Sequence, residues 1–262
     1  MKHAMVVCAY RDSPYLRECL HSISRQSVQP EQVLLATSTP SEFLQATAAE
    51  FGLAYLVNVE SRGIASDWNF CLGLTECELL TIAHQDDVYH PDYCERMLLR
   101  MREHPNATIG FCNSSEHDAT GPRTSTLNLF VKRWLTHRVF RDKNAVAEMA
   151  SKRRLLAFGN PICCPSVVFN RAALRGFCFQ DRFKSNLDWY AWYELANRDG
   201  DFVYEALPLA SKRAHRLSET SVLLDNRTRE KEDRIMFALF WPKPVAALLA
   251  FFYRLGYLAN RV

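Results

Sequence analysis

Two adjacent aspartates, Asp86 and Asp87, stand at the end of an apolar run. Residues 79–88 read Leu-Leu-Thr-Ile-Ala-His-Gln-Asp-Asp-Val, which predicts a buried strand that ends in a polar turn. In an open α/β sheet, ligands bind just beyond the carboxyl ends of strands. Neighbouring carboxylates repel each other, so a bound cation would allow both to stay ionised. Such oxygen ligands suit Mg²⁺ or Mn²⁺, which also bind water and substrate phosphates. The pattern favours a metal–phosphate site, although the pair could also cap the helix that opens near Pro91.

The elements that would position this site alternate between strand and helix. Strands are predicted near residues 4–9, 31–36, 53–58, 78–83 and 107–112, and helices near residues 14–26, 41–51, 64–75 and 91–103. Ser13-Pro14 supplies a cap and a first position for the first helix. This alternation predicts an α/β fold with a parallel sheet and helices on both faces.

The second half of the chain gives a weaker pattern. Residues 114–126 and 151–160 predict loops, 127–136 and 143–150 short helices, 166–169 and 201–214 strand, and 187–198 a helix. The adjacent pair Cys163-Cys164 is interpreted as packing residues in a strand, with side chains on opposite faces.

Three motifs occur in an order that is typical of one enzyme family. They are Val6-Val7-Cys8-Ala9-Tyr10-Arg11-Asp12 with Leu20, Ser22 and Gln26-Ser27; Arg62-Gly63-Ile64-Ala65-Ser66-Asp67-Trp68-Asn69; and His84-Gln85-Asp86-Asp87. The set resembles the family 2 glycosyltransferases, well over residues 3 to 114 and more weakly over residues 160 to 220. The resemblance implies a GT-A fold, in which a Rossmann-like, mostly parallel sheet is flanked by helices. It also implies transfer of a sugar from a nucleotide-diphosphate donor.

The chain departs from the family pattern at two places. His84 stands where the family has the first aspartate of its Asp-x-Asp-Asp motif, and imidazole is an acceptable ligand for an ion such as Mn²⁺. Ala36-Thr37-Ser38-Thr39 replaces the family's acidic Asp-Asp-Gly-Ser. This change removes the carboxylate expected to read the nucleotide base, and leaves Thr37 or Ser38 to bond a base edge instead.

The resemblance assigns donor-binding and metal-binding roles to residues at the strand ends. The expected nucleotide-sugar contacts are Ala9, Tyr10, Arg11, Asp12, Thr37, Ser38, Arg62, Asn69, Gln85 and Asp87, and the expected metal ligands are Asp86, His84 and His215. Asp12 could equally form a helix-capping box with Ser13, and Arg62 could be an ordinary surface arginine. The cofactor would then be Mn²⁺ or Mg²⁺, and the donor a nucleoside diphosphate sugar.

An acidic residue at a predicted helix start, Asp188, is the candidate catalytic base. The family places an acidic pair here, of which only Asp188 is kept, and a helix N-terminus stabilises an ionised carboxylate. Trp189 and Trp192 are expected to stack on the acceptor sugar. The alternative is an N-cap aspartate followed by core tryptophans.

Composition restricts the class of protein further. The 262 residues are 48% hydrophobic and 23% charged with a net charge of +3, which is globular and argues against disorder. Nine cysteines without CxxC spacing favour reduced thiols in the cytoplasm over disulfides or zinc, and no secretory signal is expected. Residues 132–154 carry eight basic and two acidic residues, a net charge of +6. Such a segment could meet anionic lipid or a diphosphate-linked acceptor, or be a solvated helix face; nucleic acid is not expected, because no binding motif accompanies the charge.

The C-terminal segment has a different character. Residues 245–253 form an apolar run that is too short to span a bilayer, and Arg254 and Arg261 follow it. The segment could lie on a membrane surface, bind a partner or pack on its own domain. We expect a GT-A domain over residues 1–222, with a nucleotide-binding half (1–114) and an acceptor half (115–222), and a helical extension over residues 223–262.

These observations predict a metal-dependent, inverting glycosyltransferase that acts on a glycan or lipid-linked acceptor in bacterial surface glycan assembly. It would be cytoplasmic, with possible attachment to the inner face of the membrane. Two alternatives remain: a nucleotidyltransferase on a similar sheet, which the absence of a Gly-rich phosphate loop disfavours, and a glycosyltransferase-like scaffold without activity.

Overall fold

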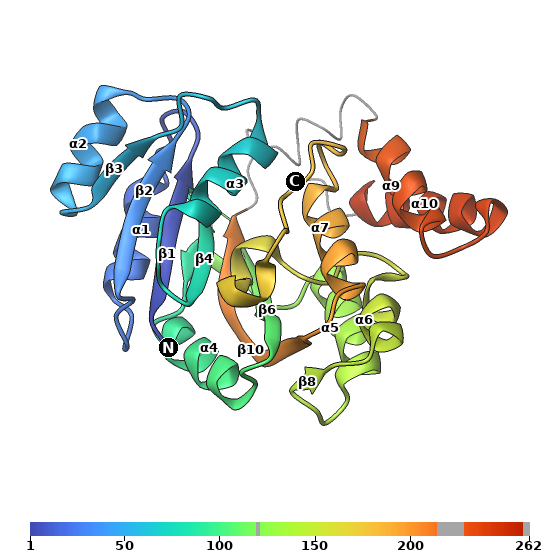
Figure 1. Cartoon of the computed structure of the whole chain (residues 1–262). Coiled ribbons are helices and arrows are strands. Elements are labelled where there is room, and N and C mark those ends of the chain that lie inside the picture. The colour runs from blue at the N-terminus through green and yellow to red at the C-terminus, as the bar shows by residue number, and fades with distance from the viewer. Residues whose placement is uncertain (119–120, 214–227, 259–262) are drawn as a thin grey trace.

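The computed structural model describes residues 1–118, 121–213 and 228–258 and confirms the predicted α/β fold (Figure 1). The strands are β1 (His3–Ala9), β2 (Gln32–Thr37), β3 (Ala54–Val57), β4 (Leu79–His84), β5 (Val88–Tyr89), β6 (Ala107–Asp118), β7 (Gly121–Arg123), β8 (Ala145–Val146), β9 (Val168–Asn170) and β10 (Asp201–Arg213). The helices are α1 (Leu16–Ser24), α2 (Glu42–Glu50), α3 (Ile64–Gly73), α4 (Tyr93–Glu103), α5 (Leu127–Phe140), α6 (Met149–Leu156), α7 (Leu187–Ala196), α9 (Thr228–Ala238) and α10 (Lys243–Leu258), with short 3₁₀ turns η1 (Cys164–Ser166) and η2 (Arg171–Leu174).

All the described strands belong to one mixed sheet. Its order is β3-β2-β1-β4-β9-β6-β10-β5, with β7 added to β6 and β8 added to β10. The first four strands run parallel, as do β6 and β10, whereas β9 lies antiparallel between β4 and β6. The parallel strands β1, β2 and β4 therefore end at the same edge, where the site was predicted.

Two hydrophobic layers cover the faces of the sheet. Along β1, Met5 and Val7 face the layer made with α1, α2 and α4, while Ala4 and Val6 face the layer made with α3, α6 and α7. Successive residues of a strand point to opposite faces, so this fully buried strand supplies both layers.

The structure corrects several boundaries predicted from sequence. Residues 114–126 include strand, since β6 continues to Asp118 and β7 pairs with it; residues 143–150 hold β8 rather than a helix; and residues 151–160 begin inside α6. Helix α1 starts at Leu16, two residues after Pro14. Cys163 is buried and Cys164 packs on the core, as expected of packing residues, but Cys164 opens η1 instead of lying in a strand.

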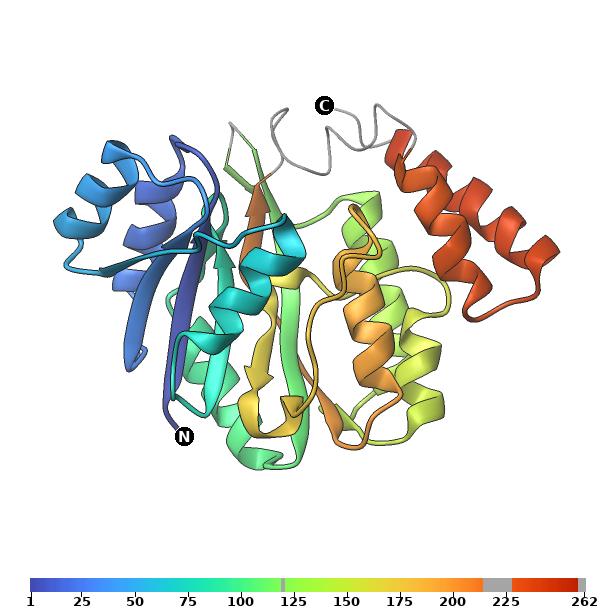
Figure 2. The same cartoon turned by 45° about the horizontal axis from the view of Figure 1, so that its top comes forward.

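The C-terminal helices α9 and α10 pack against α7. Figures 1 and 2 both place them beside α7, at the end of the molecule farthest from α2. The ring of Trp189 lies 5.1 Å from Phe237 of α9 and 5.6 Å from Tyr253 of α10. No helix in the described part of the chain is long and apolar enough to cross a bilayer. The boundary predicted near residue 222 falls outside the described residues, and the division at residue 114 stays a prediction.

Candidate active site

The ends of three parallel strands bring the first predicted residues together. Ala9 pairs with Thr37 across β1 and β2, and Cys8 pairs with His84 across β1 and β4. The loops that follow these residues therefore leave the sheet side by side. A hydrogen bond of 2.7 Å from Gln85 Nε2 to the carbonyl of Tyr10 ties two of them together.

Asp87 is held inside the protein by the end of β10. The backbone N–H of Arg213 donates to Asp87 Oδ1 at 2.9 Å, and the Arg213 Nε donates to the Asp86 carbonyl at 3.0 Å. Burial and then the neighbouring Asp86 charge raise the pKa of Asp87 to about 8. Asp87 is thus a residue that orients the turn, while the half-buried Asp86 is the carboxylate at its surface.

His84 lies against Trp68 at the mouth of the same turn. The two rings stack with centroids 5.4 Å apart, and His84 Nδ1 lies 3.6 Å from Asp87 Oδ2. Burial lowers the pKa of His84, whereas the charges of Asp86 and Asp188 oppose this shift. The imidazole therefore favours its neutral form, in which one ring nitrogen can act as a ligand.

The residues of this turn fit a divalent cation shared with a substrate. Within the described residues, no group of three or more histidine, cysteine or acidic side chains could hold a metal alone. Two buried atoms there, His84 Nε2 and Asp87 Oδ2, have no hydrogen-bond partner, and Asp86 adds a carboxylate beside them. Mg²⁺ or Mn²⁺ bound to a diphosphate needs only one or two protein ligands, because phosphate and water supply the rest. The set suits that arrangement and does not form an all-protein cage. His215, the third predicted ligand, lies outside the described residues.

Asp188 sits at the start of α7, near enough to His84 for its charge to act on that ring. Its Oδ2 accepts a hydrogen bond of 2.9 Å from Asn160 Nδ2, and its Oδ1 accepts one of 2.7 Å from the N–H of Trp189. Its charge acts on His84, Lys132 and Cys164, so it shares one electrostatic environment with the β4 turn.

The two tryptophans predicted to stack on an acceptor sugar are core residues. Trp189 and Trp192 are both 0% exposed, and Trp189 Nε1 donates to the carbonyl of Leu156. This corrects their assignment, because a fully buried ring cannot offer a face to a ligand. The alternative derived from the sequence, core tryptophans, is the one observed.

The loop after β1 presents an aromatic ring and a fixed carboxylate. Tyr10 is 47% exposed and lies under the guanidinium of Arg11. Arg11 has a φ of 58°, and its N–H donates to Thr39 Oγ1 at 2.5 Å, so the loop is fixed to the end of β2. Asp12 accepts a hydrogen bond of 2.6 Å from Ser41, the residue that caps α2.

A carboxylate that the sequence analysis did not assign fills the space beside Ser38. Asp67 of α3 accepts hydrogen bonds from Ser38 Oγ at 2.7 Å and from Asn58 Nδ2 at 2.9 Å. Thr37 is buried, and its hydroxyl accepts a bond from the Thr39 N–H. The acidic group missing from the sequence after β2 is thus supplied in space by α3. Asp67 belongs to the Arg62–Asn69 motif, but the sequence does not show that its side chain points toward Ser38 and Asn58.

Arg62 and Asn69, the two residues of that motif predicted to contact the donor, differ in their surroundings. Arg62 is exposed and precedes Gly63, whose φ of 121° requires glycine at the start of α3. Asn69 uses both ends of its amide on the backbone of Phe179, with bonds of 2.8 and 2.7 Å. Asn69 therefore anchors the 175–185 segment to α3.

Two lysines from distant elements complete the electrostatics of the site. Lys132 of α5 and Lys212 of β10 act on each other, and both act on Cys163. Burial lowers the pKa of Lys132, and the charge of Asp188 opposes this effect. No spacing in the sequence relates residue 132 to residue 212, so the sequence alone does not predict that the two lysines lie near each other.

The mixed sheet flanked by helices is the fold of a GT-A glycosyltransferase. The sequence profile of glycosyl transferase family 2 matches residues 4–174, and the chain belongs to that family. EpsH of Bacillus subtilis (strain 168), a protein named as a glycosyltransferase, is 24% identical over 123 residues. That match covers 45% of this chain and 35% of EpsH.

Solved structures show the same fold at low sequence identity. S. aureus TarS 1-349 in complex with UDP-GlcNAc has a TM-score of 0.64 at 14% identity, and the match covers 99% of this chain and 73% of that one. The mannosyltransferase PcManGT from Pyrobaculum calidifontis, in complex with GDP-Man and Mn²⁺, has a TM-score of 0.64 at 15% identity, covering 100% and 76% of the two chains.

Proposed function

We propose that this chain transfers a sugar from a nucleoside diphosphate donor to an acceptor hydroxyl, with inversion at the anomeric carbon and with help from a divalent metal. The observation that supports the proposal is that the charges of Asp86 and Asp188, from elements about a hundred residues apart, both act on His84. In this proposal Asp86 would help to neutralise the diphosphate and Asp188 would deprotonate the hydroxyl.

The diphosphate would sit at the turn after β4. A divalent cation bound by Asp86, with His84 as a second ligand, would act there as a Lewis acid on the departing diphosphate. Asp87 keeps the turn in place through Arg213, and Lys212 adds positive charge that acts on Asp87 and His84. Charge developing on the leaving group is thereby stabilised by fixed groups.

Asp188 would act as the general base. Its carboxylate takes the proton of the acceptor hydroxyl, the hydroxyl oxygen forms a bond to the anomeric carbon, and the bond to the diphosphate oxygen breaks. The two hydrogen bonds from Asn160 and Trp189 hold the carboxylate in one orientation.

The donor base would lie between Tyr10 and the Ser38–Asp67 pair. Tyr10 offers an exposed ring for stacking, and Asp67 offers a carboxylate that can only accept hydrogen bonds. Uracil and guanine carry a ring N–H on the edge that would face such a carboxylate, whereas adenine does not. The neighbours TarS and PcManGT were crystallised with uridine and guanosine donors, which supports this choice.

The cellular role we propose is assembly of a bacterial surface glycan at the cytoplasmic face of the membrane. α10 supports membrane contact, because its outward face exposes Leu248, Phe251, Phe252 and Leu255 by 45 to 59%. A protein that works on lipid-linked acceptors needs such a surface.

The proposal is tested by binding and turnover together. We expect Mn²⁺ to raise the melting temperature in the presence of UDP- or GDP-sugars, EDTA to reverse the effect, and nucleoside diphosphate to be released when a suitable acceptor is added. In Asp86→Ala, calorimetry should show loss of Mn²⁺-dependent donor binding at unchanged circular dichroism. Metal-dependent affinity equal to that of the wild type would remove Asp86 from the metal site. Donor binding without turnover over a broad acceptor panel would instead indicate a scaffold.

A further inference from the structure

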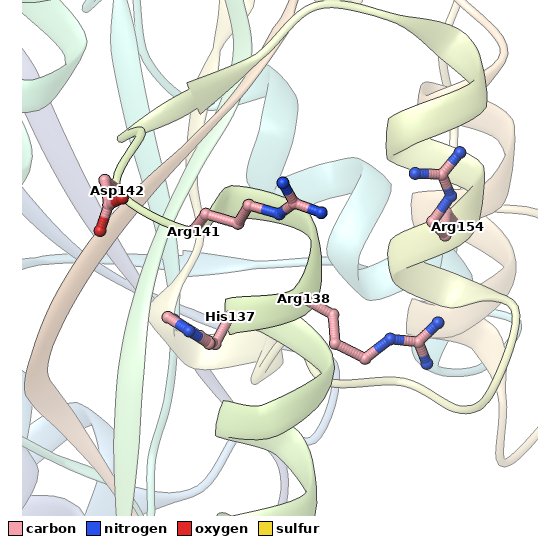
Figure 3. Close-up of a pocket in the computed structure, with 5 residues that line it drawn as sticks. All are labelled: His137, Arg138, Arg141, Asp142 and Arg154. Atoms are coloured by element: carbon pink, nitrogen blue, oxygen red, sulfur yellow. The ribbon is translucent and has the colours of Figure 1, made fainter.

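A pocket of about 600 Å³ lies outside the active site, where α5 and α6 end. His137, Arg138, Arg141, Asp142 and Arg154 line it. Figure 3 shows the three guanidinium groups reaching into the space between the two helices, while Asp142 lies on the other side of the turn. Its volume is within the range of small-molecule sites, which is roughly 300–1,000 Å³.

Two neighbouring basic residues are engaged in hydrogen bonds, whereas these three arginines form no ion pair with a described residue. Lys152 is buried and donates to the carbonyls of Arg198 and Gly200, and Arg153 donates to Asn197 and Leu239. By contrast, Arg138, Arg141 and Arg154 have no ion-pair partner among the residues that the structure describes. Within the basic segment, Lys152 and Arg153 are therefore structural cations, and Arg138, Arg141 and Arg154 are available for an anion.

Two features position the available groups. The guanidinium of Arg138 lies 4.7 Å from the ring of Trp134 and 5.2 Å from that of Phe158, which limits its freedom. Arg141 has a φ of 50°, a conformation that favours glycine, while its N–H donates to the carbonyl of His137 at the end of α5. A non-glycine residue held in this way directs its side chain from the turn into the pocket.

The helix ends explain part of this arrangement. Cations are favoured in the last turn of a helix, and both α5 and α6 carry basic residues there. That effect acts on each helix separately and does not require the two ends to share a cavity. Three like charges in one pocket repel each other, and a doubly charged anion would relieve this repulsion.

A second pocket with aromatic lining shares two arginines with this one. Arg138 and Arg154 also line a second pocket of about 370 Å³, together with Phe158, Phe240 and Trp241. The Phe158 and Trp241 rings lie 5.1 Å apart. The two pockets thus place planar, bidentate donors next to aromatic surface, a combination suited to a phosphate group joined to an apolar body.

We propose that this arginine pocket, formed by Arg138, Arg141 and Arg154, binds a phosphate or diphosphate group outside the catalytic site. The chemistry is shared by a free phosphate ester and by the headgroup of an anionic lipid, and the experiment separates the two. It does not depend on the proposed transferase activity.

The test compares two variants of equal charge. Arg138→Gln/Arg141→Gln/Arg154→Gln removes the pocket cations, and Arg25→Gln/Arg102→Gln/Arg175→Gln removes three exposed arginines elsewhere. Binding of inorganic pyrophosphate is measured by calorimetry, and binding to phosphatidic acid vesicles by flotation, with circular dichroism as a check of folding. The single variant Arg154→Gln, at an exposed position, serves if the triple variant is unstable.

We expect the pocket variant to lose one class of binding at least tenfold and the control variant to keep it. Loss in the pyrophosphate arm indicates a soluble phosphate ester, and loss in the vesicle arm alone indicates a lipid headgroup. Raising the salt concentration should weaken the binding in either case, since the contacts are electrostatic. Equal behaviour of the pocket variant and the wild type in both arms, or equal loss in the control variant, would overturn the proposal.

Discussion

Asp188 is the residue on which the proposed chemistry most depends. In Asp188→Asn, the new amide oxygen can still accept from the Trp189 N–H, but the bond from Asn160 is lost. We expect turnover to fall by roughly 10²- to 10⁴-fold with donor affinity unchanged, because a general base contributes about that much. The measurement is steady-state release of nucleoside diphosphate.

Asn160 provides the matched control for that substitution. Asn160→Ala removes the same hydrogen bond and leaves the carboxylate in place, so it should keep most of the turnover. If the two variants lose activity equally, orientation rather than proton transfer accounts for the effect, and Asp188 is not the base.

Asp67 should determine which nucleotide base is accepted. Its carboxylate is held by Ser38 and Asn58, and an acceptor-only group is matched by bases that carry a ring N–H. In Asp67→Asn we expect affinity for UDP and GDP to fall roughly 10- to 100-fold, since a hydrogen bond to a charged group contributes about 1.5–3 kcal/mol. Weak binding of ADP should not change.

Titration calorimetry with the three nucleotides checks this expectation. Asn58→Ala, which removes one bond to the same carboxylate and keeps its charge, should retain the preference for UDP and GDP. An equal loss for all three nucleotides in Asp67→Asn would mean that the residue supports the loop without reading the base.

Helix α9 fixes the segment that precedes α7, the helix that carries Asp188. The Glu232 carboxylate accepts three backbone hydrogen bonds of 2.8 to 3.0 Å, from Lys184, Ser185 and Asn186. Asn186 also donates its amide to Asp233 at 2.8 Å. The N-cap residue Asn186 forms no side-chain cap bond to α7, and the Glu232 carboxylate instead fixes the backbone immediately before the helix. The C-terminal helices therefore help to position Asp188.

Asp233 should make stability depend on pH. Burial raises its pKa to about 6, and within the described residues its Oδ2 has no hydrogen-bond partner. The folded state then binds a proton more tightly than the unfolded state, so unfolding free energy should fall as pH rises from about 4 to about 6. A shift of about two pKa units corresponds to at most about 3 kcal/mol.

In Asp233→Asn this dependence should disappear. Asparagine can still accept from Asn186 through its amide oxygen, and it carries no charge to bury. We expect the variant to be more stable than the wild type above pH 6 and similar to it at pH 4, by urea denaturation. A pH profile identical to that of the wild type would exclude Asp233 as the titrating group.

The sequence predicted those elements whose signals are local. The strand ends at Ala9, Thr37 and His84 follow from apolar runs that stop at polar residues. The prediction failed for α6, because Lys152-Arg153-Arg154 has the composition of a loop. In the fold, Lys152 is buried and donates to the carbonyls of Arg198 and Gly200. The strands β7 and β8 have only two or three residues and exist through their partners β6 and β10.

The candidate site divides in the same way. Asp86, His84 and Asp188 were proposed from motifs and their order, since each stands next to a strand or helix end, and their roles stay predictions. Asp67, Lys132 and Lys212 were missed because their roles depend on contacts between elements that are far apart in sequence. The prediction for Trp189 and Trp192 was wrong for a related reason: the sequence does not show burial, and both rings are fully covered in the fold.

At the scale of the whole molecule, the end formed by α9 and α10 buries some apolar side chains in the core and exposes others to solvent. α9 and α10 bury Met236, Phe237, Ala246 and Ala250 in the core, so removal of residues after Arg234 should unfold the protein rather than release it from a membrane. Membrane contact must therefore be tested on the outer face of α10, with the helix left in place.

Phe251→Ser/Phe252→Ser is the variant that separates contact from folding. Both rings are more than half exposed, at 55 and 59%, so the melting temperature should change by less than a few degrees. If α10 lies in the interface of an anionic bilayer, each aromatic side chain contributes about 1.5–3 kcal/mol of apolar burial, and binding should fall at least tenfold. Flotation with phosphatidylglycerol vesicles measures this. Val59→Ser/Leu99→Ser, which removes exposed apolar side chains elsewhere, should bind as the wild type does. Vesicle binding that is absent in the wild type, or equal in the two variants, would show that α10 is a packing element alone.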